Sequence, residues 1–205
     1  PTHDAVVLGA GAAGLYCAGI AAQRGLGVLL VDHAKAPGEK IRISGGGRCN
    51  FTNLRSRPEA FLSENPHFAK SALARHGAED FVALVRRHGI AFHEKTLGQL
   101  FCDGKATQIV AMLRKELAGA ELRLGTSVEG ISLADNIFRL RLSTGDEVRT
   151  GNLVIATGGK SIPKMGATGF GYRVAAQFGL PVTETRPGLV PLTFGPEALE
   201  WMAPL

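Results

Sequence analysis

The sequence predicts an α/β domain in which a central parallel sheet is extended by an antiparallel β-meander. Three observations support this fold class. A short apolar run, Ala5–Leu8, is followed by a glycine-rich turn, an alanine-rich segment and a second apolar run, Gly27–Val31. Alternating residues around Ser143–Asp146 indicate a hairpin, and the uncharged run Leu153–Ala156 indicates a final buried strand. Because parallel strands buried on both faces have continuous apolar runs, a Rossmann-like architecture follows.

The first strand–helix–strand unit has the spacing of a dinucleotide-binding fingerprint. Gly9, Gly11 and Gly14 form the pattern GxGxxG directly after the first strand, and Asp32 follows the second strand, eighteen residues beyond Gly14. In such a fingerprint the first glycine makes the tight turn, the second admits a pyrophosphate, and the third allows close helix–strand packing. The helix N-terminus attracts phosphate. Asp32 is expected to accept hydrogen bonds from ribose hydroxyls.

The same stretch has a second interpretation, a signal peptide or a membrane span, because no side chain from Ala5 to Ala22 is charged. However, residues 1–4 include no Lys or Arg, and the glycines have dinucleotide spacing. We therefore predict neither a signal peptide nor a membrane span.

The middle of the chain alternates between loop, helix and strand patterns. Residues 34–53 have the composition of a loop, and residues 66–88 that of two helices separated near Gly77. The expected core residues of these helices are Phe68, Leu73, Phe81, Leu84 and Val85. The later elements, in order, are a hairpin of 90–93 with 99–101, an amphipathic helix over 107–117, strands over 121–124, 127–133, 137–142, 147–150 and 153–156, and a helix over 170–178.

This order of elements is an organisation of FAD-binding domains. In such domains the last strand, here ending in Ala-Thr-Gly, returns beside the first strand, and its glycines lie near the cofactor. FAD proteins more often have Glu where this chain has Asp32, so NAD stays open as the ligand.

Composition limits the functional class. The 205 residues, 45% hydrophobic and 20% charged, suit one folded domain. The formal net charge is +5, but the basic residues are dispersed, so we expect a small-molecule substrate; a nucleic-acid partner stays open but has no support in the sequence. Cys17, Cys49 and Cys102 have neither CxxC nor zinc spacing, and no other metal-ligand pattern is present. We therefore expect a reduced, cytoplasmic protein without a metal or a membrane partner.

Three segments together resemble one family. They are the fingerprint Gly9–Gly14, the loop Gly38–Asn53 with its Ser-Gly-Gly-Gly-Arg-Cys-Asn sequence, and the segment Ala156–Tyr172. In sequence and order they resemble the BaiN-like flavoproteins, also called NAD(P)/FAD-dependent oxidoreductases or aminoacetone oxidase family FAD-binding enzymes. The resemblance implies that residues 1–205 form the N-terminal portion of an FAD-binding domain. It also implies that a substrate domain and a C-terminal return of the FAD-binding domain are absent from this sequence.

The resemblance assigns cofactor contacts to three groups of residues. The pyrophosphate and adenosine would contact Gly9, Gly11, Ala12, Ala13, Gly14 and Asp32. His33 is a further candidate only because it follows Asp32, and an exposed loop histidine is the alternative. The ribityl chain and flavin ring would lie beside Lys40, Ser44, Gly45, Gly46, Gly47, Arg48, Cys49 and Asn50. Adenine would meet Val128, and the pyrophosphate side would be closed by Ala156, Thr157, Gly158 and Gly159.

No catalytic residue can be assigned from the sequence. Cys49 has no partner at the CxxC or CxxxxC spacing of disulfide reductases, so we interpret it as a small residue packed under the cofactor. The favoured function is an FAD-dependent oxidoreductase that transfers hydride on a small organic substrate. An NAD-dependent dehydrogenase with the same fingerprint and a non-catalytic flavin-binding module are the alternatives.

Overall fold

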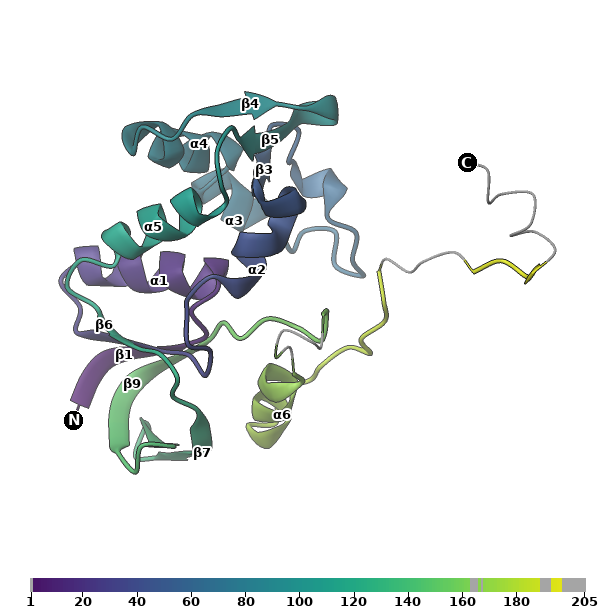
Figure 1. Cartoon of the computed structure of the whole chain (residues 1–205). Coiled ribbons are helices and arrows are strands. Elements are labelled where there is room, and N and C mark those ends of the chain that lie inside the picture. Colours follow the sequence, from purple (N-terminus) through teal and green to yellow (C-terminus); the bar gives the residue numbers. More distant parts are fainter. Residues whose placement is uncertain (1, 163–165, 167, 189–192, 197–205) are drawn as a thin grey trace.

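The first strand–helix–strand unit forms as predicted. In the computed structural model, which describes residues 2–162, 166, 168–188 and 193–196, β1 (Thr2–Leu8) pairs in parallel with β2 (Val28–Val31). α1 (Ala12–Gln23) joins the two strands (Figure 1). Its alanines favour the helix, which ends where Gly25 adopts a positive φ of 85°. All four residues of β2 are buried, as expected for a strand covered on both faces.

The central sheet has six strands in the order β6-β2-β1-β9-β8-β7. β6 (Glu121–Arg123), β2, β1 and β9 (Glu147–Ile155) run parallel. β8 (Ile137–Leu142) and β7 (Val128–Ala134) extend the sheet as an antiparallel meander. The predicted fold class is confirmed, as is the return of the last strand beside the first.

One detail of this sheet differs from the prediction. The sequence predicts separate strands over 147–150 and 153–156, but β9 is a single strand that spans both. Its first half pairs with β8, and from Arg149 onward it pairs with β1. The two neighbours hold one continuous strand where local patterns indicate two.

Both faces of the central sheet are buried. One face of β1, with Ala5 and Val7, packs against α1 and α5 (Thr107–Glu116). The opposite face, with Val6 and Leu8, packs against the meander. Since successive side chains point to opposite faces of a strand, β1 needs an unbroken apolar run to fill both layers. Full burial of one such side chain contributes about 1.5–3 kcal/mol.

The predicted helices around Gly77 form as α3 (Lys70–Arg75) and α4 (Ala78–Arg87). Asp80 accepts a hydrogen bond from the N–H of Gly77 at 2.7 Å, which caps α4. The prediction that Phe68 is a core residue is wrong, because this residue is 78% exposed. α3 begins two residues later and leaves Phe68 in the preceding turn.

The segment 34–53 is not the loop that its composition predicts. It contains α2 (Glu39–Ile43), a turn η1 (Ser44–Gly47) and β3 (Asn50–Asn53). β3 belongs to a second sheet, of order β3-β5-β4, which we call the small sheet. Its other strands, β4 (Phe92–Glu94) and β5 (Gln99–Cys102), form the predicted hairpin. β3 is polar, so pairing with a distant strand rather than local preference makes it a strand.

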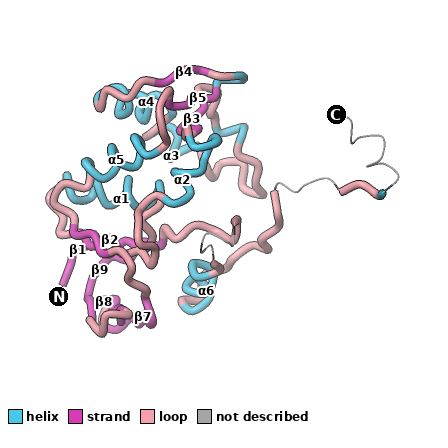
Figure 2. The backbone as a smooth tube through the Cα atoms, in the orientation of Figure 1, coloured by secondary structure: helices cyan, strands magenta, loops and turns pink. Residues whose placement is uncertain are grey.

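The two sheets lie on opposite sides of a layer of helices. Figure 2 shows α1, α2 and α5 between the central sheet and the small sheet. The short turns η2 (Pro58–Ala60) and η3 (Thr96–Gly98) connect elements near the small sheet, and α6 (Phe170–Gln177) packs on the meander. Residues 163–165 and 167 of the third family motif lie outside the described residues. Within the described ranges, no helix has both the length and the apolar character needed to cross a membrane.

Candidate functional site

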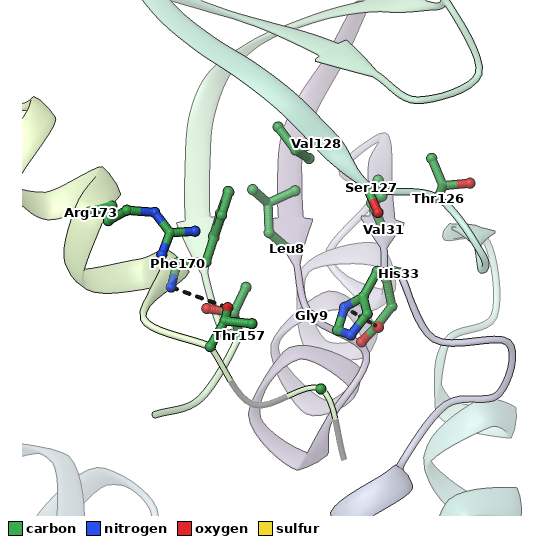
Figure 3. A pocket seen from close by; sticks show the side chains of 13 residues that line it. Leu8, Gly9, Val31, His33, Thr126, Ser127, Val128, Thr157, Phe170 and Arg173 are labelled. Atoms are coloured by element: carbon green, nitrogen blue, oxygen red, sulfur yellow. Dashed lines mark hydrogen bonds and ion pairs between the residues drawn. The ribbon is translucent and has the colours of Figure 1, made fainter. Parts of the chain in front are cut away.

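A pocket of about 320 Å³ lies at the carboxyl ends of β1, β2 and β9 (Figure 3). In a doubly wound sheet this is the edge at which ligands bind. Its lining residues come from all parts of the chain: Leu8, Gly9, Val31, Asp32, His33, Thr126, Ser127, Val128, Thr157, Gly166, Thr168, Phe170 and Arg173. The strand ends thus form a concave site from segments far apart in the sequence.

The three fingerprint glycines have different physical reasons to be glycine. A side chain at Gly9, whose φ is 104°, would lie 2.5 Å from the carbonyl oxygen of Ala156, and one at Gly14 would collide with the carbonyl oxygen of Gly9. A side chain at Gly11 would meet no protein atom within 4 Å, and its φ of −82° suits any residue. Protein packing therefore explains Gly9 and Gly14, whereas Gly11 leaves open space beside the helix start.

The start of α1 is suited to an anion. Its N-cap Gly11 provides no side-chain cap, and the first turn contains no acidic residue. The first N–H groups of a helix have no intrahelical partner, and the helix dipole adds a partial positive charge there. Ala12 and Ala13 are exposed in this turn. The open space at Gly11 and these donors together fit a phosphate group.

Asp32 joins the end of β2 to the glycine turn. Its carboxylate accepts hydrogen bonds from the N–H of Ala10 at 2.5 Å and from the N–H of Ala34 at 2.8 Å. His33 lies 3.3 Å from the same carboxylate, Nδ1 to Oδ1, and Figure 3 shows its ring at the pocket. Since an ionised carboxylate has about four acceptor sites, Asp32 keeps capacity for two ribose hydroxyls.

The loop Ser44–Asn50 is built on left-handed backbone. Gly45, Gly46 and Gly47 have φ values of 56°, 65° and 84°, which side chains disfavour. A side chain at Gly45 would also lie 2.7 Å from the ring of Phe101, whereas Gly46 faces open space. Arg48, which follows, is exposed. The loop therefore presents backbone and one guanidinium, with little steric bulk.

Lys40 links this region to the segment after β9. Its Nζ donates to Ser161 Oγ at 3.0 Å, and it lies 3.7 Å from the position a Gly158 side chain would take. At the same end of α2, the N–H of the N-cap residue Gly38 donates to the carbonyl of Ala10 at 2.8 Å. The structure thus brings together the fingerprint turn, α2 and the Ala-Thr-Gly-Gly segment.

Cys49 has a cysteine neighbour that the sequence does not reveal. The pairing of Asn50 with Phe101 places Cys49 across from Cys102, and the N–H of Cys102 donates to the carbonyl of Arg48 at 3.0 Å. Both thiols are buried, and neither forms a disulfide. Burial raises the pKa of Cys49, and burial together with neighbouring Cys49 raises the pKa of Cys102 to about 11. Such thiols stay protonated at neutral pH, which suits packing rather than nucleophilic chemistry.

The structure gathers part of the predicted site in the pocket. Gly9, Asp32, His33, Val128 and Thr157 line it. The other predicted residues lie outside its lining, at the α1 start, on α2 with the glycine loop, or after β9: Gly11, Ala12, Ala13, Gly14, Lys40, Ser44, Gly45, Gly46, Gly47, Arg48, Cys49, Asn50, Ala156, Gly158 and Gly159. Their roles in cofactor binding stay predictions.

Two lining residues that the sequence analysis missed are chemically informative. Arg173 adds a cation to the pocket, 5.9 Å from the ring centroid of Phe170. Both Arg173 and Phe170 belong to α6, and the glycine-rich segment between β9 and α6 was the sequence signal that could have indicated them.

Thr157 Oγ1 is buried without a hydrogen-bond partner among the described residues, so a polar ligand atom could satisfy it. Within the same described part of the chain, no three His, Cys, Asp or Glu side chains form a metal-binding group.

The family model described as the HI0933-like protein Rossmann domain matches residues 3–195. Over 96% of its length the chain is 55% identical to the Escherichia coli (strain K12) protein named ribosomal RNA dihydrouridine synthase, and the match covers 50% of that protein. Identity is 48% to the Haemophilus influenzae protein of the same name, with 92% of this chain and 48% of that protein covered. The chain spans about half the length of the curated relatives it matches.

A more distant relative is named as a reductase of a different substrate. The Clostridium scindens 3-dehydro-bile acid delta(4,6)-reductase is 29% identical over 91% of this chain and 46% of that protein. Among solved structures, halogenase PltM in complex with phloroglucinol and FAD matches with a TM-score of 0.50 and 21% identity, covering 89% of this chain and 37% of that one. NikD, an amino acid oxidase, matches with a TM-score of 0.50 and 16% identity, covering 78% and 52%. These structures show similarity of fold alone.

The comparisons correct one expectation. The expectation against a nucleic-acid partner is wrong, because two relatives at 48–55% identity are named for action on ribosomal RNA. Dispersed charge in a sequence does not exclude a basic surface, since distant residues such as Arg55 and Lys95 can lie at the same end of one sheet. The Rossmann domain that the resemblance implies is confirmed, whereas the BaiN-like assignment within it stays a prediction. With residues 3–195 matched, the chain belongs to the HI0933-like family.

Proposed function

We propose that this chain forms the FAD-binding part of a flavoenzyme that reduces uridine to dihydrouridine in ribosomal RNA. The observation that supports it most is the 55% identity, over nearly the whole chain, to a protein named ribosomal RNA dihydrouridine synthase. At this identity the fingerprint, the glycine loop and the segment after β9 belong to one shared framework. The match covers half of that relative, so the activity of the whole protein is part of the proposal.

The fit of FAD to this chain rests on open space and on polar groups. Gly11 and the uncapped start of α1 would receive the pyrophosphate, and Asp32 the adenosine ribose. Val128 and Thr157 would flank the adenosine within the pocket. The remainder of FAD would extend past Lys40 toward the Ser44–Asn50 loop. Each proposed contact with FAD uses open space or a polar group that still has hydrogen-bonding capacity.

The proposed reduction of a carbon–carbon double bond agrees with the names of two kinds of relatives, the ribosomal RNA dihydrouridine synthases and the delta(4,6)-reductase. Dihydrouridine is uridine with two hydrogen atoms added across its C5–C6 double bond, and a delta(4,6)-reductase likewise acts on carbon–carbon double bonds. Bound FAD, once reduced, would supply a hydride to one carbon of the double bond, and a proton from water or an acidic group would complete the addition at the other. This chain would bind and orient the cofactor, and the glycine loop would allow a flat ring to approach the flavin closely. Arg48 and Lys40 would balance negative charge.

A direct test uses the full-length gene product, loaded with FAD and reduced chemically under anaerobic conditions. Ribosomal RNA from cells that lack the gene is the substrate, and mass spectrometry of the digested nucleosides measures dihydrouridine. We expect dihydrouridine to form in ribosomal RNA and not from free uridine. If the RNA stays unmodified while a steroid with conjugated double bonds is reduced, the RNA assignment is wrong and the bile acid relative is the better guide. Protein that never retains FAD would contradict the cofactor itself.

A further inference from the structure

The outer face of the small sheet lies directly beside the glycine loop. In this sheet Asn50 pairs with Phe101 and Phe101 pairs with His93, so the three residues form a row across β3, β5 and β4. The residues that alternate with them, Leu100 and Cys102, are buried on the opposite face. The row therefore points away from the core.

This face presents aromatic rings together with a cation. The rings of His93 and Phe101 are stacked, with centroids 6.4 Å apart and planes 18° from parallel. Lys95 Nζ lies 5.3 Å from the centroid of Phe101. His93 Nδ1 is hydrogen-bonded to Asp103 at 2.6 Å, which fixes the orientation of the imidazole. We call Asn50, His93, Lys95 and Phe101 the sheet platform.

Positive charge borders the platform at the hairpin end. Lys95 and Arg55 are exposed, and no ion pair is found for either within the described part of the chain. Arg55 lies at the hairpin, its Cγ 3.1 Å from the position of a Gly98 side chain. The nearby acid Asp103 is already paired with His93. Two free cations next to stacked rings complement a phosphodiester chain with exposed bases.

The platform is continuous with the glycine loop. A side chain at Gly45 would lie 2.7 Å from Phe101 Cε1 and 2.7 Å from the nitrogen of Asn50. The aromatic row thus begins where the loop that we place beside the flavin ends. A base stacked on this row would hold its strand next to the reacting nucleotide.

From these contacts we infer that the sheet platform binds a single-stranded segment of the RNA substrate. Bases stack on His93 and Phe101, and Lys95 and Arg55 contact the phosphates. Single-stranded RNA is recognised in this way, because unstacked bases offer their faces to aromatic side chains. The inference rests on the proposed function, since the platform would position RNA for the flavin site.

The test measures binding of a fluorescently labelled, uridine-containing RNA oligonucleotide to the full-length, FAD-loaded protein over a range of salt concentrations. Lys95→Gln combined with Arg55→Gln should lower the slope of log affinity against log salt by about 1.4, since each phosphate contact on a single strand contributes about 0.7. Phe101→Leu should weaken binding roughly tenfold and leave the slope unchanged, because it removes stacking and no charge. Arg139→Gln, an exposed arginine of β8, is the matched control and should change neither.

The outcomes separate the platform from the proposed function. If the unaltered enzyme binds and modifies RNA but the platform variants match the Arg139→Gln control, the platform is refuted and the function stands. If the variants lose thermal stability or FAD and keep their affinity for RNA, the face packs against another part of the protein and the inference is wrong. If the unaltered enzyme neither binds RNA nor forms dihydrouridine, the proposed function fails and the platform fails with it.

Discussion

The carboxylate of Asp32 accepts a hydrogen bond from the N–H of Ala10 at 2.5 Å, so the acid that ends β2 also holds the glycine turn that follows β1. Its other oxygen accepts from the N–H of Ala34 at 2.8 Å. In the fingerprint this acid is associated with the ribose alone. Here it also fixes the backbone on which the pyrophosphate would rest.

Replacing Asp32 by Asn should therefore affect the protein even without cofactor. An amide has one acceptor oxygen, so one of the two backbone N–H groups would face an NH₂ donor. We expect the free energy of unfolding of the FAD-free protein to fall by about 1–3 kcal/mol, measured by urea denaturation. FAD affinity should fall as well. Asp135→Asn, at an exposed turn position with no side-chain hydrogen bond among the described residues, is the control and should be neutral. Equal stability of the two variants would contradict the role of Asp32 in the turn.

A substitution at Gly11 should abolish cofactor binding without preventing the protein from folding. A Cβ there meets no protein atom within 4 Å, and a valine side chain would fill the space proposed for the pyrophosphate. We expect Gly11→Val in the full-length protein to fold and to lose FAD, as measured by flavin absorbance after purification. Gly151→Val is the matched control, because Gly151 also has open space and no positive φ. Retention of FAD by Gly11→Val would rule out the fingerprint assignment.

The sequence predicts those parts of the fold that local patterns encode. The first strand–helix–strand unit, the meander and the hairpin of β4 and β5 are formed by residues close in sequence. β3 is not predicted from the sequence, because its polar residues form a strand only through pairing with β5, some fifty residues away. The continuity of β9 is likewise set by its two neighbouring strands.

The same reason limits prediction of the site. Asp32 follows from strand ends and spacing, Val128 follows from the family resemblance, and both line the pocket. Arg173 and Phe170 enter it because α6 folds back beside β9; the glycines before α6 indicate a turn, but they do not indicate which residues of the helix reach the pocket. The proximity of Cys49 and Cys102 depends on strand register, as does the row of Asn50, Phe101 and His93. Contacts between residues far apart in the sequence therefore create most of the site features that the sequence motifs do not predict.

The hydrogen bond between Lys40 and Ser161 yields a prediction about cofactor affinity. Lys40 Nζ lies 3.0 Å from Ser161 Oγ, at the junction of α2 and the segment after β9. Lys40→Met keeps the length of the side chain and removes the charge. We expect FAD to bind roughly tenfold more weakly, as for the loss of one charge-assisted hydrogen bond of about 1.5 kcal/mol. Fluorescence titration with FAD measures the change. Lys35→Met, an exposed lysine nearby, should leave the affinity unaltered.

The paired thiols of Cys49 and Cys102 should be unreactive in the folded protein. Burial raises both pKa values, that of Cys102 to about 11, so little thiolate exists at neutral pH. We expect mass-spectrometric mapping after alkylation to show labelling of both cysteines only when the protein is unfolded. Cys49→Ala should retain FAD and dihydrouridine formation. Fast labelling of Cys49, with loss of turnover in the alanine variant, would instead indicate a redox thiol next to the flavin.

Glu116 predicts a pH dependence of stability that is independent of the cofactor site. It joins three helices, since its carboxylate is hydrogen-bonded to His88 on one side and to Gln23 and Arg87 on the other. The bond with His88, followed by those with Gln23 and Arg87, lowers the pKa of Glu116 below its ordinary 4.5. A lowered folded-state pKa means that the stabilisation is complete above the unfolded value and is lost as the pH falls through the folded value.

Glu116→Gln should therefore cost about 1–2 kcal/mol of unfolding free energy at neutral pH, and progressively less as the pH drops below 4.5. Urea denaturation of both proteins across this range measures the difference. Glu129→Gln serves as the comparison, because Glu129 forms an exposed pair with Arg141, and such pairs contribute about 0–1 kcal/mol. A stability difference for Glu116→Gln that stays constant with pH would show that shape, rather than the ionised carboxylate, holds the three helices together.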